Sequence, residues 1–189
     1  MVSGKPDKHT KEVSVSIIYL PDRQWQMLEL SWLHLGYSTR TIAKNALQGF
    51  FALNKQYYTE AAARDAKSRG ISQQEHYRLM RDGKSLPRII DVVDYPASPI
   101  AWVPNLMCAE NKRRYNTIEL SVFNYTLLQF AVVLDGGSLP SVVSKCIYAH
   151  LGESYELNPT DNSRVGAWAR SYYPQIRLNE KEIYTESDS

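Results

Sequence analysis

Residues 13–51 read VSVSIIYL, PDRQWQMLELSWLHLG and YSTRTIAKNALQGFF, and this stretch decides the fold. Its first eight residues are rich in β-branched side chains and roughly alternate, which predicts a short strand. Pro21 and Asp22 suit the first turn of a helix, and Gly36 is typical of a helix C-terminus. Ser38 is expected to cap a second helix. The pattern therefore predicts a strand, a helix, a tight turn and another helix.

Both predicted helices carry apolar residues at helical spacing. The apolar positions are Trp25, Leu28, Trp32 and Leu35 in the first helix, and Ile42, Ala46, Leu47 and Phe50 in the second. A single unit of this size does not bury its own apolar stripe, and a lone strand leaves its backbone edge unpaired. The unit is therefore expected to pack against a partner.

A second stretch with the same pattern lies one hundred residues further on. Residues 117–151 read TIELSVFNYTLLQFAVVLDGGSLPSVVSKCIYAHL, in which Gly136 and Ser138 repeat the signals of a helix end followed by a cap. Five residues are identical at this offset: Ile18 and Ile118, Leu20 and Leu120, Leu28 and Leu128, Gly36 and Gly136, Ser38 and Ser138. We interpret the two stretches as a diverged internal repeat. The alternative is a pair of unrelated helical hairpins.

The two stretches resemble the ribbon-helix-helix family, of the MetJ and Arc repressor type. The matching features are Leu20-Pro21-Asp22, the spacing from Pro21 to Gly36, and Ser38 to Leu47, with Leu120-Ser121, Gly136 and Ser138 in the second copy. The resemblance implies a fold that is mainly α with short β (α+β), in which two strands pair as a ribbon and enter the DNA major groove. Because both copies lie in one chain, it implies tandem units that form an intrachain pseudo-dimer.

The pattern divides the chain into five segments. They are a basic N-terminal arm (1–12), a first unit (13–53), a connector of helices followed by a Pro-interrupted extended segment (54–112), a second unit (113–152), and a C-terminal extension with an acidic mobile tail (153–189). Lys112-Arg113-Arg114 is expected to precede the second strand, as Lys11 precedes the first.

The composition is that of an ordinary globular protein, with 43% hydrophobic and 22% charged residues. A net charge of +2 neither supports nor excludes nucleic acid as a partner. The chain has no targeting segment and no apolar run long enough to span a membrane, so we expect a cytoplasmic protein. Its four histidines are scattered, and it lacks a phosphate-binding glycine loop. We therefore expect no catalytic activity, cofactor or metal.

Two kinds of DNA-contacting residue are predicted. The start of a helix binds anions through its free N–H groups, which suggests phosphate contacts near both predicted caps and near the strands. These phosphate-binding residues are Ser38, Thr39, Arg40, Ser138, Lys11, Lys112, Arg113 and Arg114. Carried over from the family frame, the base-facing strand residues are Val15, Ile17 and Tyr19 in the first copy, and Tyr115, Thr117 and Glu119 in the second.

The strand register has two alternatives. In the family frame Ser16, Ile18 and Leu20 point inward. A shift by one residue would instead bury Val13, Val15 and Ile17 and turn the serines outward. Then Ile18 and Leu20 point outward unless a β-bulge intervenes.

The leading hypothesis is a DNA-binding regulator, or a plasmid or phage accessory protein, that binds double-stranded DNA. The alternative is a non-enzymatic interaction module of the same fold, whose apolar ribbon face binds a protein partner or a second copy of the chain. The outward face of the strand pair distinguishes the two. A polar and basic face indicates DNA, whereas a contiguous apolar patch indicates protein.

Overall fold

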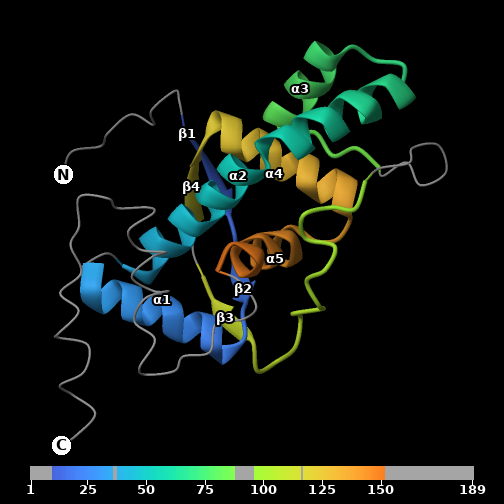
Figure 1. The fold of residues 1–189 in the computed structure, drawn as a ribbon. Coiled ribbons are helices and arrows are strands. Elements are labelled where there is room, and N and C mark those ends of the chain that lie inside the picture. The colour runs from blue at the N-terminus through green and yellow to red at the C-terminus, as the bar shows by residue number, and fades with distance from the viewer. Residues whose placement is uncertain (1–9, 36–37, 88–95, 116, 152–189) are drawn as a thin grey trace, which may run out of the picture.

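The computed structural model describes residues 10–35, 38–87, 96–115 and 117–151, and it shows a mixed α+β fold (Figure 1). The elements are β1 (Thr10–Ser14), β2 (Ile17–Tyr19), α1 (Asp22–Leu35), α2 (Thr39–Ser68), α3 (Gln73–Arg81), β3 (Lys112–Arg114), β4 (Thr117–Ser121), α4 (Val122–Asp135) and α5 (Leu139–Leu151). The predicted arm lies almost wholly outside the described residues, as do the C-terminal extension and the helix stop at Gly36.

The strands form two short antiparallel ladders, β1 with β4 and β2 with β3. The ladders share one register, because Ser14 lies opposite Thr117 and Ile17 opposite Arg114. Between the ladders the Tyr115 amide donates a 2.9 Å hydrogen bond to the Ser16 carbonyl. We call the whole pairing the ribbon. The predicted antiparallel pairing of these two parts of the chain is confirmed.

The inward side of the first strand does not follow either predicted register throughout. Val13 and Val15 are buried, and so are Ile18 and Leu20, whereas Ser16 is exposed. The inward face therefore advances by three residues, from Val15 to Ile18, where the two ladders are interrupted. This interruption lets all four apolar side chains reach the core. The expectation that Ser16 points inward is wrong.

The helices of the two halves begin at matching positions. Helices α1 and α4 each have 14 residues and begin one hundred residues apart, at Asp22 and Val122. Helices α2 and α5 also begin one hundred residues apart, at Thr39 and Leu139.

The longest helix, α2, packs against most of the other elements. It has 30 residues and contacts α1, α3, α4, α5 and β4. Its predicted apolar face is confirmed, since Ile42, Ala46, Leu47 and Phe50 are all buried. The helix continues without a break past the predicted boundary at residues 53–54. Its second half belongs to the same core through Tyr58, whose ring contacts Phe51 edge-on.

Serine hydroxyls cap the N-termini of four helices, where free backbone N–H groups need an acceptor. The predicted caps are confirmed at α2, where Ser38 accepts from the Thr41 amide, and at α5, where Ser138 lies 3.4 Å from the Ser141 nitrogen. Ser72 caps α3 and Ser121 caps α4 in the same way.

The segment from residue 96 to 111 contains no strand and covers part of the core. It contributes three buried side chains, Ile100, Val103 and Leu106, while its prolines interrupt regular structure. It leads directly into β3, so Lys112 to Arg114 form a strand and do not merely precede one.

Within the described ranges, no single helix is long and apolar enough to cross a membrane. Helices α4 and α5 meet that criterion only as a pair, and this pair is bent by 105°.

Candidate functional site

The ribbon has one face toward the core and one face away from it. Helices α2 and α4 contact β4, and α5 contacts β2. Because side chains alternate along a strand, the neighbours of the buried residues point outward. We call these residues the outer ribbon face: Glu12, Ser14, Ser16, Ile17 and Tyr19 on the first strand, and Lys112, Arg114, Thr117 and Glu119 on the second.

The outer ribbon face is mainly polar. Its apolar members, Ile17 and Tyr19, are both half-buried. The serines and charged residues of the face are exposed, and Thr117 is half-buried. This composition differs from the apolar surface that the sequence suggested.

On this face the positive charges lie in one half of the ribbon and the negative charges lie in the other. Lys112 lies opposite Tyr19 at one end, with Arg114 two residues nearer the centre. At the other end Glu12 lies directly opposite Glu119. Two like charges at opposing positions destabilise a strand pair, so the second end is held by its apolar neighbours and not by its charges.

Two of the six predicted base-facing residues are misplaced. Val15 is fully buried, so the prediction that it faces a base is wrong. Tyr115 packs partly against the core, and its hydroxyl donates a 3.1 Å hydrogen bond to the Thr39 carbonyl. Burial raises the pKa of this hydroxyl, which therefore stays a neutral donor. The other four residues, Ile17, Tyr19, Thr117 and Glu119, belong to the outer ribbon face, although Tyr19 also packs partly against the core.

The predicted phosphate residues of the first copy lie beside the ribbon. Ser38 and Arg40 are exposed, and Thr39 is half-buried. The Arg40 guanidinium donates to the Thr117 carbonyl of β4, so the start of α2 is joined to the ribbon edge. This contact could not be foreseen from the sequence, because it joins residues 77 positions apart.

The second turn of α5 is joined to the opposite part of the ribbon. The Ser144 hydroxyl accepts a 2.9 Å hydrogen bond from the Tyr19 amide of β2, and it donates to the Pro140 carbonyl at 2.6 Å. Ser138 is exposed immediately before the first residue of this helix. The ribbon is therefore bonded to the start of α2 at one place and to the second turn of α5 at another.

The four basic residues predicted near the strands fall into two groups. Lys11 donates to the Arg81 carbonyl and lies 4.8 Å from the centre of the Tyr125 ring. Arg113 forms a 2.6 Å ion pair with Glu29 and lies 4.7 Å from the Trp25 ring centre. Lys11 therefore links the ribbon to α3 and α4, and Arg113 links it to α1.

Lys112 and Arg114 form the second group. They point away from the core and are exposed. The expectation that Lys112 and Arg114 only flank a strand is corrected by their place in β3. In the sequence, these two residues are recognisable as part of the basic triplet that directly precedes Tyr115.

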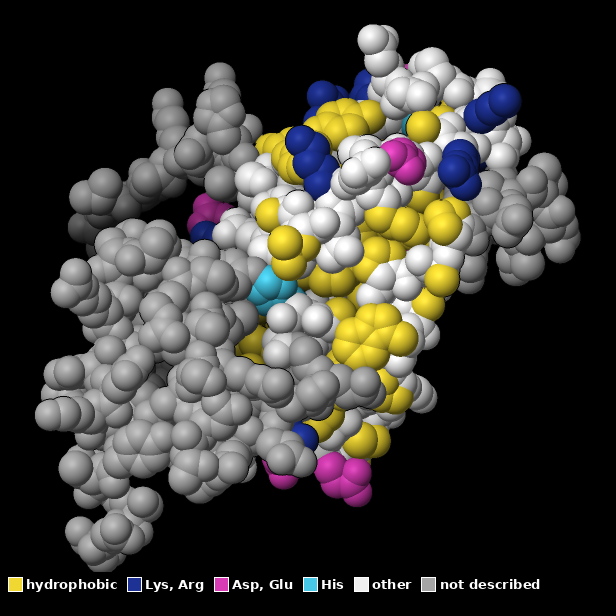
Figure 2. All heavy atoms as spheres, in the orientation of Figure 1, with side chains coloured by type: hydrophobic (Ala, Val, Ile, Leu, Met, Phe, Trp, Pro, Cys, Tyr) yellow, Lys and Arg dark blue, Asp and Glu magenta, His cyan; other side chains and the backbone are white. Residues whose placement is uncertain are grey.

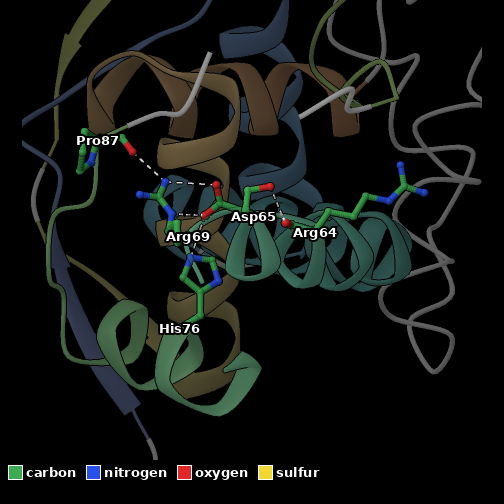
Figure 3. Close-up of polar contacts among 6 residues, drawn as sticks. Arg64, Asp65, Arg69, His76 and Pro87 are labelled. Atoms are coloured by element: carbon green, nitrogen blue, oxygen red, sulfur yellow. Dashed lines mark hydrogen bonds and ion pairs between the residues drawn. The ribbon is translucent and has the colours of Figure 1, made fainter. Parts of the chain in front are cut away.

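A second polar cluster lies inside the protein, at the end of α2 (Figure 3). Arg69 Nε is 2.6 Å from Asp65 Oδ2, and an Arg69 Nη donates to the Pro87 carbonyl at 2.7 Å. His76 Nε2 lies 2.9 Å from Asp65 Oδ2 without a well-aligned hydrogen bond. Asp65 and His76 are each 1% exposed. We call this the Asp65 cluster.

The Asp65 cluster joins α2, α3 and the segment that follows α3. The sequence offers one signal for it, the four-residue spacing of Asp65 and Arg69 on a helix. The position of His76 depends on the tertiary fold. A shallow groove of about 340 Å³ lies beside it, lined mostly by small and apolar parts of α2, α3 and α4. Such a lining, with one histidine against the Phe130 ring, indicates packing and not chemistry.

The face of the molecule seen in Figure 2 differs from the outer ribbon face. Hydrophobic side chains gather there over α4, α5 and the segment before β3, and Lys and Arg lie mostly over α3 and the end of α2. On α3, Arg78 and Arg81 form ion pairs with Glu75 and Asp82. This pairing is typical of a solvated helix surface.

Among the described residues, no three His, Cys, Asp or Glu side chains come together to hold a metal ion. Comparison of the chain with known protein families, curated proteins and solved structures finds no match.

Proposed function

We propose that this chain binds double-stranded DNA by laying its outer ribbon face in the major groove. A two-stranded ribbon fits that groove, and its outward side chains then meet the edges of the bases. The observation that carries the proposal is the exposure of Lys112 and Arg114 on β3, on the side of the strand that faces away from the core.

The surroundings of the ribbon support the same proposal. The start of α2 at Ser38 lies beside it and carries free backbone N–H groups at the positive end of that helix. The start of α5 at Ser138 offers fewer, because Pro140 has no N–H and the Ser141 amide donates to Ser138. When the ribbon lies in the groove, the sugar-phosphate backbones on either side pass these two helix starts. Phosphate contacts made there fix orientation, and the ribbon side chains read the bases.

The organisation of the chain supports a tandem ribbon-helix-helix arrangement. The resemblance seen in the sequence is strengthened by helix starts that repeat after one hundred residues and by the shared register of the two ladders. We propose that the two units form an intrachain pseudo-dimer and that the protein is a non-catalytic regulator or accessory factor of the cytoplasm.

The alternative, in which an apolar ribbon face binds a protein, is less well supported. It requires a contiguous apolar patch. The outer ribbon face offers only Ile17 and Tyr19, both half-buried, beside exposed charges.

The experiment is a titration of the full chain with labelled random-sequence duplex DNA, followed by fluorescence anisotropy across a series of salt concentrations. We expect affinity to fall with salt, because each phosphate contact releases counterions. Lys112→Ala should weaken binding and reduce the slope of log affinity against log salt, by about one if Lys112 contacts a phosphate.

Lys67→Ala is the matched control, since Lys67 is also exposed but lies near the end of α2. It should leave both the affinity and the slope unchanged. No binding at low salt would contradict the proposal, and so would equal effects of the two variants.

A further inference from the structure

The two halves of the ribbon carry different side chains at positions related by the hundred-residue offset. The counterpart of Lys112 is Glu12, and the counterpart of Arg114 is Ser14. Both members of each pair are exposed on the outer ribbon face. The backbone arrangement is therefore repeated, whereas the chemistry presented to a ligand is not.

Because of the strand register, this difference makes the two ends of the ribbon chemically unlike. At one end Tyr19 lies opposite Lys112. At the related position of the other end Glu119 lies opposite Glu12. One pair can donate hydrogen bonds through an ammonium group and a phenol. The other carries two carboxylates, which accept hydrogen bonds and repel phosphate.

At the positions nearer the centre, one half of the ribbon again carries a basic residue and the other half does not. Arg114 faces outward opposite Ile17, and its counterpart Ser14 lies opposite Thr117. A guanidinium pairs bidentately with O6 and N7 of guanine, whereas a hydroxyl discriminates weakly between bases. Guanine readers are thus concentrated in one half of the ribbon.

We propose that the target is a non-palindromic duplex whose guanine requirement lies under Lys112 and Arg114, in one half of the site. The inference rests on the proposed function. The half under Ser14 and Thr117 is read weakly, and the carboxylates of Glu12 and Glu119 disfavour close approach of phosphates there. A symmetric operator would offer the same base edges to both halves, and this face matches only one of them.

The test begins with selection of duplexes from a random library by the purified wild-type chain. The expected product is a motif without two-fold symmetry, with a guanine preference confined to one half. Replacing these guanines by adenines should weaken wild-type binding by roughly ten- to a hundred-fold, the usual range for loss of one good bidentate contact. Arg114→Ala should lose most of this preference for guanine.

A gain-of-symmetry variant supplies the matched comparison. Glu12→Lys with Ser14→Arg gives the second half the same basic side chains as the first. The selected motif should then move toward two inverted guanine-containing halves. All of these positions are exposed, so the substitutions are expected to preserve the fold, which circular dichroism checks.

The outcomes separate the inference from the function on which it rests. A palindromic motif for the wild-type chain, or an Arg114→Ala variant that keeps the guanine preference, would overturn the asymmetric target while leaving DNA binding intact. Absence of any binding to duplex DNA at low salt would overturn the proposed function, and the asymmetric target with it.

Discussion

Removal of the Asp65 carboxylate should destabilise the protein more than any single change on its surface. Asp65 is 1% exposed and lies within 2.9 Å of both Arg69 and His76. Among the described residues, replacement by alanine leaves the Arg69 guanidinium, whose side chain is 10% exposed, with the Pro87 carbonyl as its remaining hydrogen-bond partner. Breaking a buried pair in this way costs about 3–5 kcal/mol. Domains are commonly stable by about 5–15 kcal/mol, so this is a large part of the total.

Urea unfolding followed by circular dichroism measures the loss, and the thermal midpoint should fall by roughly 10 °C. The double variant Asp65→Leu with Arg69→Met removes both charges and should be more stable than Asp65→Ala, because no charge is left buried alone. The control is Glu75→Ala, which breaks an exposed ion pair with Arg78 and should change stability little. A loss below about 1 kcal/mol for Asp65→Ala would refute the reasoning.

Two further predictions concern pH and helix capping. Burial lowers the pKa of His150 to about 4, below its ordinary value of 6.5; the unfolded chain therefore binds a proton that the folded chain does not, and stability should fall by up to about 1.4 kcal/mol per pH unit as pH drops from 6.5 toward 4. Urea midpoints measured across this range should depend less on pH in His150→Gln, and an unchanged dependence would contradict the assignment. Ser38→Ala removes the cap that accepts from the Thr41 amide at 3.2 Å and should cost about 1 kcal/mol in urea unfolding. Ser138→Ala should cost less because its contact is longer, at 3.4 Å, and the reverse order would be evidence against this ranking.

The elements built from local signals were predictable. Strand character came from β-branched residues, and both second helices begin after the serines that cap them. The hundred-residue offset also located the strand that pairs with the first one. What the pattern missed is the change of face between Val15 and Ile18. One register buries Ile18 and Leu20, and the other buries Val13, Val15 and Ile17, so periodicity alone does not choose between them.

The candidate site was predicted less well than the fold. Ile17, Tyr19, Thr117 and Glu119 lie on the outer ribbon face because they alternate with buried neighbours, and their contact with bases stays a prediction. The role of Arg113 depends on Trp25 and Glu29, which come from another part of the chain. Contacts of this kind are set by tertiary packing and leave no periodic signal.

The buried face in the second half of the long helix α2 also depends on tertiary packing. Ala61, Ala62 and Ala66 favour a helix wherever they occur, and they do not indicate which face will be buried. Burial of Asp65 among them is decided by α3, which brings His76 against the end of α2. A charged residue within an alanine-rich helix is more often solvated, so the spacing of Asp65 and Arg69 does not by itself predict that Asp65 is buried.

Linking both halves in one chain explains how the outer ribbon face can be chemically uneven. In a dimer of identical chains every substitution occurs twice, so Glu12 and Lys112 could not differ. Under the proposed arrangement each half changes by itself, while the ribbon is held by covalent connection. The entropy of closing a connecting loop grows only with the logarithm of its length, and pairing within one chain does not depend on protein concentration. An asymmetric face is therefore compatible with a stable ribbon, and under the proposed DNA binding the charge difference between its two ends would select one orientation on the duplex.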